Sequence, residues 1–168
     1  MIAAGAMADL FAFLESLGVT CQRVDHPPVY TVDEAARLVP PLPGAKTKNL
    51  FLRDQKGLRH FLVVVGHDKA VDLKALAPAI GASKLSLGSA ERLKARLDIE
   101  PGAVSLLALV NDPDHEVELV VDRPLWQADA LQCHPLVNTA TLVVPRDALE
   151  RVLAATGHRP RVVDVPER

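Results

Sequence analysis

The chain has 168 residues, 49% of them hydrophobic, which suits one domain with a single core. No apolar run approaches the ~20 residues that a membrane-spanning helix needs, and the N-terminal residues lack the features of a secretion signal. Cys21 and Cys133 lie far apart and form no disulfide framework, as expected in a reducing compartment. We therefore expect a cytoplasmic protein without membrane contact, with residues 1–6 as an unstructured extension and residues 7–168 as the domain.

The net charge of -2 conceals a basic segment. Residues 44–74 contain seven lysines and arginines against three aspartates, a local charge of +4, whereas the flanking segments carry no positive excess. A basic face of this kind can dock a nucleic-acid backbone even on an acidic protein. A solvated, lysine-rich hairpin would have the same composition, so charge alone leaves both interpretations open. If the segment docks a backbone, Lys56 and Arg59 are expected to contribute more to binding than to turnover.

Local patterns at the start of the chain predict two helices and a strand. Apolar residues spaced i, i+3, i+4 and i+7 predict a helix over residues 8–17, and residues 19–24 are predicted to form a strand. Thr31 and Glu34 form a capping box, so a short helix is expected to begin at Val32. The prolines that follow end this helix, because proline has no N–H for a helical hydrogen bond.

The middle of the chain contains a hairpin signal. Two apolar runs, residues 48–53 and 58–65, flank the turn over residues 54–57 and predict a β-hairpin whose second strand is central. The remaining elements are expected in this order: a helix capped by Asp72, a strand over 84–87, a helix from Ser89 to about Leu97, strands over 103–110, 115–121 and 138–144, a helix after Pro145, and an edge strand over 160–165. Because hairpins and helical crossovers alternate, we predict one α/β domain with a mixed, largely antiparallel sheet flanked by helices.

The residues exclude several common chemistries. The sequence contains no GxSxG, HExxH, P-loop or GxGxxG motif, and its six histidines show no metal-ligand spacing. Cys133 and His134 look like a nucleophile and a base, but neighbours on an extended chain point to opposite faces and do not easily form a hydrogen bond. We therefore expect no metal and no cofactor, and these residues alone predict only an α/β domain that binds an anion.

Six longer segments follow one another in an order and spacing that is far more specific than any short motif. They are HPPVYTVDEA (residues 26–35), KTKNLFLRD (46–54), VGHDK (65–69), GASKLSL (81–87), EPGAVS (100–105) and CHPLVNTAT (133–141). Together they resemble the family of stand-alone aminoacyl-tRNA deacylases related to the editing domain inserted in bacterial prolyl-tRNA synthetase. The resemblance runs from about Leu10 to Val163 and implies the fold of that prolyl-tRNA synthetase-associated editing domain.

Two of these segments resemble the branch of the family that removes alanine from proline tRNA. They are the TKNLFL form after Lys46 and the CHPLVNT form at Cys133, whereas the cysteine-editing branch tends to carry Lys-Thr-Leu at the first position. One departure is the segment over residues 105–108, where many relatives have proline and glycine. This departure is expected to reshape a wall of the substrate pocket.

The resemblance also implies roles for individual residues. Lys48 matches the family's essential lysine, whose cation would bind the terminal phosphate or the ester carbonyl, while Gly102 and Ala103 would direct backbone N–H groups toward the oxyanion or the attacking water. The implied substrate-binding residues are Lys46, Asn49, His67, Ser105, His134, Asn138 and Thr139. An ordinary surface lysine and a plain Pro-Gly turn would account for the same residues without catalysis.

The implied reaction is hydrolysis of the ester in alanyl-tRNA(Pro), which needs a placed water and oxyanion stabilisation rather than a protein nucleophile. The implied partners are the acceptor end of tRNA(Pro) carrying a small amino acid and, transiently, prolyl-tRNA synthetase. One alternative is the same reaction on cysteinyl-, seryl- or another small aminoacyl-tRNA. The other is a tRNA-end binding module without catalysis.

Overall fold

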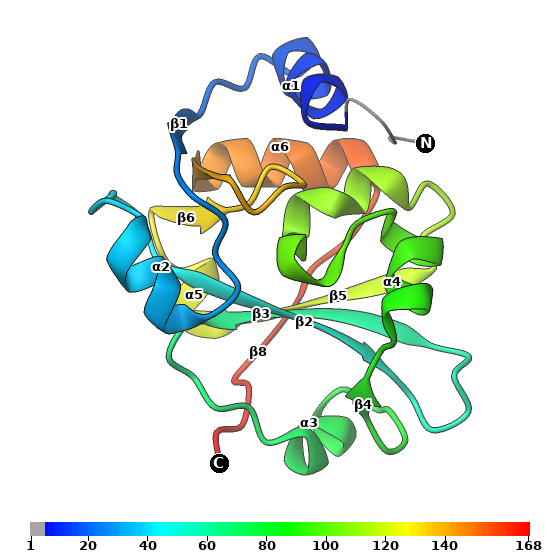
Figure 1. Ribbon diagram of the computed structural model, residues 1–168. Helices are drawn as coiled ribbons and strands as arrows, with labels where there is room; N and C mark the ends of the chain where they lie inside the picture. Colours follow the sequence, from blue (N-terminus) through cyan, green and yellow to red (C-terminus); the bar gives the residue numbers. More distant parts are fainter. Residues whose placement is uncertain (1–5) are drawn as a thin grey trace.

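The computed structural model describes residues 6–168, which form two β-sheets with helices packed around them (Figure 1). The first helix, α1 (Ala6–Ser16), agrees with the prediction. Residues 1–5 of the expected N-terminal extension lie outside the described residues, and Ala6 already belongs to α1. No helix in the described part of the chain is both long and apolar enough to cross a membrane.

The larger sheet has the strand order β4-β2-β3-β5-β8. Its strands are β2 (Thr47–Arg53), β3 (His60–Gly66), β4 (Ser86–Leu87), β5 (Val117–Asp122) and β8 (Arg161–Val163). The β2–β3 hairpin and the β4 edge are antiparallel, whereas β5 and β8 join in parallel. Every residue of β3 before Gly66 is buried, which confirms the prediction that this strand is central.

The smaller sheet has the order β1-β7-β6 and is wholly antiparallel. Its strands are β1 (Gln22–Asp25), β6 (Ala130–Cys133) and β7 (Ala140–Pro145). A single parallel bridge between Ala45 and Leu131 links it to the start of β2. The prediction of a single α/β domain with mixed strands is confirmed, but the strands divide into two sheets, and β6 and the short α5 (Arg123–Trp126) had no signal long enough to predict them.

Three predicted helix caps are confirmed. The side chains of Thr31, Asp72 and Ser89 accept hydrogen bonds from backbone N–H groups three residues ahead, at the starts of α2 (Val32–Leu38), α3 (Leu73–Ala79) and α4 (Ala90–Leu97). The last helix, α6 (Arg146–Thr156), ends at Gly157 in the left-handed conformation (φ 80°), as the sequence indicates.

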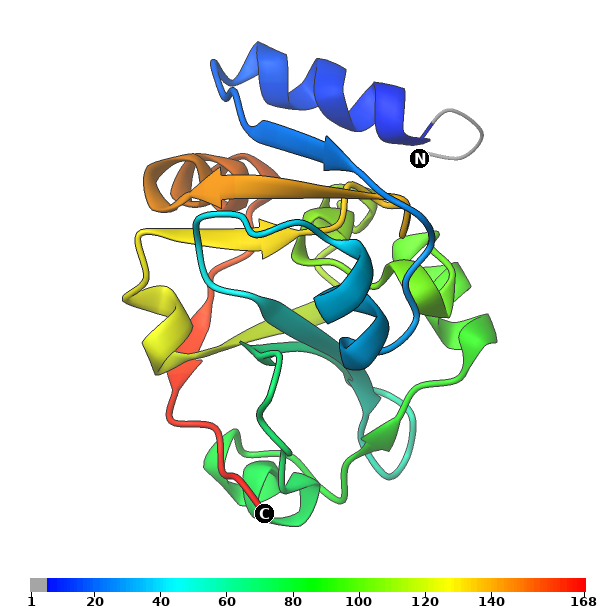
Figure 2. The same cartoon turned by 60° about the vertical axis from the view of Figure 1, so that its left-hand side comes forward.

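The helices divide the hydrophobic core in two. On one face of the larger sheet, α4 and α6 enclose the main cluster, and α1 lies over the smaller sheet (Figures 1 and 2). On the opposite face, α3 covers a second cluster that includes Leu52, Phe61 and Leu76. The larger sheet is therefore buried on both faces, and its polar residues reach solvent mainly at the strand ends.

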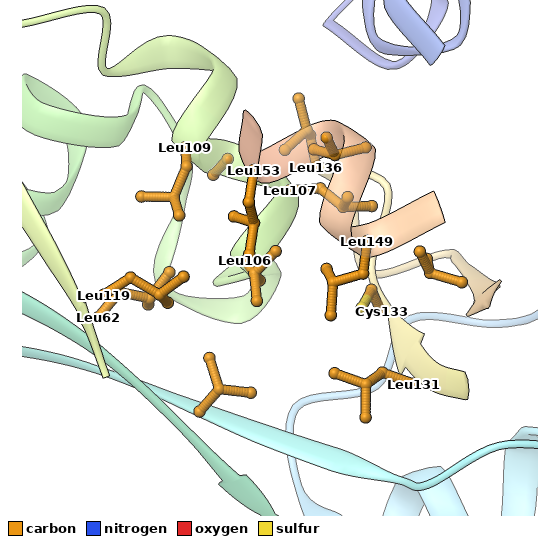
Figure 3. Close-up of a cluster of buried hydrophobic side chains, with 14 of the residues drawn as sticks. Leu62, Leu106, Leu107, Leu109, Leu119, Leu131, Cys133, Leu136, Leu149 and Leu153 are labelled. Carbon is orange, nitrogen blue, oxygen red and sulfur yellow. The ribbon is translucent and has the colours of Figure 1, made fainter. Parts of the chain in front are cut away.

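The predicted strand over residues 103–110 is wrong. The chain there forms two 3₁₀ helices, η1 (Pro101–Ala103) and η2 (Leu106–Asn111). The Oγ of Ser105 accepts a hydrogen bond from the N–H of Leu107, which begins a helical turn instead of a ladder. A run that is apolar throughout has no period that separates a strand from a buried helix, and here the leucines pack against Leu149 and Leu153 of α6 (Figure 3).

Candidate active site

A pocket of about 260 Å³ lies where α2, the start of β2, η1 and the end of β6 meet. Its apolar lining consists of Val29, Ala35, Ala36, Val39, Pro101, Val104 and Cys133, and its polar lining of Tyr30, Thr31, Lys46, Thr47, Lys48, Asn49, His67, Gln132, His134 and Thr141, with Gly102 between them. The hydroxyl of Thr47 donates to the carbonyl of Gln132 (2.6 Å), which holds β2 against β6. The pocket thus depends on contacts between elements far apart in the sequence.

Lys48 lies on β2 opposite Val65 of β3, and its half-buried side chain lines the pocket. Its ammonium group donates a hydrogen bond to the backbone carbonyl of Lys69, and within residues 6–168 no carboxylate forms an ion pair with it. The backbone of Lys69 is held by a hydrogen bond from its N–H to the carbonyl of Gly66 (3.0 Å), and its side chain pairs with the buried carboxylate of Asp122 (2.8 Å). Lys48 therefore presents a positioned positive charge that is not neutralised by a neighbouring acid.

Asn49 contributes an unsatisfied acceptor. Its Oδ1 atom is buried and has no hydrogen-bond partner within the described part of the chain. Leaving such a group unpaired costs about 1–3 kcal/mol, so its presence at a pocket marks a place where a ligand donor would be accommodated. His67 begins the loop after β3 and lines the same pocket, held by a backbone hydrogen bond to the carbonyl of Lys46 (3.2 Å).

Cys133 and His134 do not form a nucleophile and base pair, because the thiol of Cys133 stays protonated. Burial lowers the pKa of His134 below 6.5, so the ring is neutral at pH 7. Its Nδ1 lies 3.2 Å from the carbonyl of Ala140, which can only accept, so Nδ1 carries the proton and Nε2 keeps a lone pair. Burial raises the pKa of the Cys133 thiol to about 12, which keeps it protonated and rules it out as a nucleophile near neutral pH.

Gly102 lies in the first turn of η1, where backbone N–H groups have no partner inside the helix. A side chain here would crowd the pocket, since a Cβ would lie 3.0 Å from two ring carbons of Tyr30 and 3.1 Å from the amide nitrogen of Asn138. Ala103 differs from the expectation. It is buried, and its N–H already donates to the carbonyl of Glu100 (2.9 Å), so this donor is not directed at the pocket.

The structure brings together six of the ten predicted residues in the pocket lining: Lys46, Lys48, Asn49, His67, Gly102 and His134. Ser105 lies outside it, because it is fully buried and caps η2. Asn138 is not part of the lining, and its side-chain amide donates to the carbonyl of the lining residue Val29 (3.2 Å). Thr139 is exposed, and its backbone carbonyl accepts from the N–H of His26 (2.9 Å).

The expectation that residues 105–108 form a pocket wall is also wrong. Leu106, Leu107 and Ala108 are almost completely buried in the main core, where Leu106 and Leu107 lie beside Leu149 and Leu153 of α6 (Figure 3). The neighbouring residue that lines the pocket is Val104. Sequence reasoning in turn missed the wall that α2 provides, with Ala35, Ala36 and Val39, and the adjoining residue Tyr30. The capping box at Thr31 located this helix, but nothing local indicated that it faces β2.

Comparisons with known proteins support the resemblance. A sequence profile described as the aminoacyl-tRNA editing domain matches residues 26–152. The chain is 37% identical over 156 residues to "Prolyl-tRNA editing protein ProX" of Acetoanaerobium sticklandii, covering 93% of this chain and 95% of that protein. It is 39% identical over 158 residues to "Prolyl-tRNA synthetase associated domain-containing protein 1" of Danio rerio, covering 92% of this chain and 85% of that protein.

The fold is likewise shared with a solved structure. A candidate trans-editing enzyme for prolyl tRNA synthetase superimposes with a TM-score of 0.68 at 19% sequence identity, over 97% of this chain and 98% of that one. This likeness supports the fold, while the profile match and the two relatives support the family. The predicted family resemblance is confirmed, and the chain belongs to the aminoacyl-tRNA editing domain family.

Proposed function

We propose that the protein hydrolyses the ester of alanyl-tRNA(Pro) and so corrects a charging error. The observation that carries this proposal is the composition of the pocket, in which the unneutralised Lys48 ammonium shares about 260 Å³ with the small side chains of Ala35 and Ala36. This volume lies just below the ~300–1,000 Å³ of pockets for drug-sized ligands and has room for one aminoacyl group. The relatives whose names refer to prolyl-tRNA editing and to prolyl-tRNA synthetase point to the tRNA.

In the proposed reaction, water attacks the ester carbonyl, the bond to the ribose oxygen breaks, and the ribose hydroxyl leaves with a proton. Lys48 would stabilise the negative charge that develops on the carbonyl oxygen or hold the terminal phosphate. The lone pair on Nε2 of His134 would accept a hydrogen bond from the attacking water, and Oδ1 of Asn49 would accept one from the amino group of the substrate. No protein nucleophile is required, in keeping with the protonated thiol of Cys133.

Size would provide the selectivity. A synthetase pocket built for proline rejects a smaller amino acid weakly, since each missing methylene is worth only about 1–3 kcal/mol. A second pocket that is too tight for proline removes the error, because overpacking commonly costs a similar amount. Ala35, Ala36 and Val39 on α2 would form the wall that sets this limit.

The proposed partner is the acceptor end of tRNA(Pro), met in the cytoplasm where tRNA is charged. The enzyme must distinguish this tRNA from correctly charged alanine tRNA, so bases of the acceptor stem would be read in addition to the amino acid. Lys46 is exposed at the edge of the pocket and suits a phosphate contact. A transient complex with prolyl-tRNA synthetase would place the enzyme where the mischarged product is released.

The test is a panel of alanyl-, seryl-, cysteinyl- and prolyl-tRNA(Pro), with alanyl-tRNA(Ala) as the control for tRNA identity. We expect the alanyl ester on tRNA(Pro) to be hydrolysed fastest, the seryl ester next, and the prolyl ester very slowly. Fastest loss of the cysteinyl ester would move the protein to the cysteine-editing branch. Tight binding without hydrolysis of any ester would indicate the non-catalytic binding module instead.

A further inference from the structure

One exposed aromatic ring stands at the mouth of the pocket. Among the described residues, the large hydrophobic side chains that remain exposed are Tyr30, Leu58 and Leu87, at 71%, 76% and 65% of their full area. Leu58 follows the hairpin turn and Leu87 lies on the edge strand β4, whereas Tyr30 lines the pocket. An exposed ring beside a polar pocket is a candidate contact for a ligand that extends outside it.

The backbone on both sides of this ring is fixed. The N–H of Tyr30 donates to the carboxylate of Glu34 (3.2 Å), which belongs to the capping box of α2. The N–H of Val29 donates to the carbonyl of Asn138 (3.3 Å), and the side chain of Asn138 donates back to the carbonyl of Val29 (3.2 Å). The backbone that carries the ring is thus held in place by the start of α2 and by the loop before β7.

Gly102 lies against one edge of the Tyr30 ring. A Cβ at this position would lie 3.0 Å from Cδ1 and Cε1 of Tyr30, closer than ordinary van der Waals contact, so the absence of a side chain lets the ring approach η1. The rest of the ring stays open to solvent, as its 71% exposure requires. Tyr30 therefore presents a free aromatic surface close to the residues that would hold the ester.

The ring of Tyr30 lies where the terminal base of the proposed substrate would be expected. If the amino acid occupies the pocket, the ribose that carries it lies at the mouth, and the base on that ribose lies just beyond. Bases of a single-stranded end are unstacked and bind well to aromatic side chains, at about 1–3 kcal/mol per base. We propose that Tyr30 stacks on the terminal adenine of the tRNA and thereby positions the ester against Lys48; this inference rests on the proposed function.

The kinetic test compares three variants. Tyr30→Ala removes the ring and is expected to raise KM for alanyl-tRNA(Pro) about tenfold or more, with a smaller change in kcat. Tyr30→Phe keeps the ring and is expected to behave like the native protein. Leu58→Ala removes an equally exposed apolar side chain far from the pocket and is expected to leave KM unchanged. An unchanged KM for Tyr30→Ala would overturn the proposal, as would a loss confined to kcat.

A binding test needs no hydrolysis. Because Tyr30 is the sole tyrosine in the sequence, tyrosine labelled in its ring gives one set of NMR signals. The uncharged trinucleotide CCA is expected to shift these ring protons upfield through the ring current of adenine, while CC followed by an abasic sugar is expected to leave them in place. Equal shifts with both ligands, or with neither, would overturn the stacking.

The two readouts separate this inference from the function on which it rests. If CCA shifts the ring but no aminoacyl ester is hydrolysed, the stacking contact stands and the proposed activity fails. If alanyl-tRNA(Pro) is hydrolysed while neither the ring signals nor the KM of Tyr30→Ala responds, the activity stands and the stacking is wrong. The thermal unfolding midpoint of each variant checks that the fold is intact.

Discussion

The two ends of the β2–β3 hairpin carry similar polar side chains and use them differently. At the closed end, the carboxylate of Asp54 accepts from the N–H groups of Leu58 and Arg59 (2.9 and 3.1 Å), and these bonds to the backbone hold its pKa below the usual range. The guanidinium of Arg59 makes two hydrogen bonds to Glu118 (2.9 and 2.8 Å). Asp54 and Arg59 at this end are therefore satisfied within the protein.

The open end has the opposite character. There the ammonium of Lys48 donates a hydrogen bond to a backbone carbonyl and, among the described residues, pairs with no carboxylate. Oδ1 of Asn49 has no hydrogen-bond partner within residues 6–168. The basic residues of segment 44–74 therefore have different surroundings. The guanidinium of Arg59 is paired with Glu118, whereas Lys46 and Lys48 line the pocket, and docking of a nucleic-acid backbone by this segment stays a prediction.

Lys48→Ala should have the largest effect on activity. We expect the rate on alanyl-tRNA(Pro) to fall on the order of 10²–10³-fold, as when one donor to a developing oxyanion is removed. Stability should change little, because this half-buried ammonium has no ion pair to lose. The measurement is single-turnover deacylation beside a urea unfolding curve, with Lys46→Ala as the control. A variant that keeps most of its rate would remove Lys48 from the reaction.

His60→Ala should show the reverse pattern at the closed end. The ring is 1% exposed, stacks on Phe51 at 5.7 Å, and accepts from the guanidinium of Arg96. Its removal leaves a cavity and should lower the free energy of unfolding by about 2–4 kcal/mol. Deacylation measured well below the unfolding midpoint should stay near the native rate. A large loss of rate in folded protein would show that the two ends are coupled.

Substitutions at two glycines test whether effects on activity and effects on stability separate in the same way. Gly102→Ala would bring a Cβ to 3.0 Å from the ring of Tyr30, so we expect kcat/KM to fall about tenfold with a small change in stability. Gly81→Ala meets nothing within 4 Å, but its φ of +67° strains any side chain, so it should lower stability by about 1 kcal/mol and leave kcat/KM unchanged. Steady-state kinetics and thermal unfolding of both variants would decide whether these effects separate.

Smaller effects are expected from the two types of surface cation. Lys46→Gln should weaken tRNA binding a few-fold and reduce the salt dependence of log affinity by about 0.7, the value for one contact to a single-stranded phosphate. Arg59→Gln should leave both unchanged, because Glu118 already neutralises that guanidinium. Fluorescence anisotropy at several salt concentrations measures both quantities. An equal decrease in affinity and in salt dependence in the two variants would indicate that the whole basic hairpin docks the tRNA.

The smallest expected effect is on the pH dependence of stability. Burial lowers the pKa of both His60 and His134 below 6.5, and the guanidiniums of Arg96 and Arg92 lower that of His60 further. The unfolded chain then binds protons at a higher pH than the native state, so stability should decline as the pH falls from about 6.5 toward the native pKa values. Urea unfolding between pH 7 and pH 5 measures this slope. Stability that is constant or rises over this range would contradict it.

The sequence by itself determined most of the local elements and the family. Thr31, Asp72 and Ser89 cap helices because each side chain bonds an N–H only three residues away, so the signal and its partner lie in one short segment. The apolar runs of the hairpin likewise identified β2 and β3. Six of the ten site residues expected from the sequence also line one pocket, while their roles stay predictions.

Only the tertiary structure decided how these elements enclose a site. The strand predicted over 103–110 became η1 and η2 because burial beneath α6 replaced ladder pairing. The pocket depends on bonds between residues 85 and 109 positions apart, from Thr47 to Gln132 and from Asn138 to Val29. Whether a charged or polar group is neutralised or left free is set by such distant partners, which local sequence does not specify. This is why the unneutralised charge of Lys48 and the unsatisfied oxygen of Asn49 could be distinguished from the paired groups at the closed end only in the folded chain.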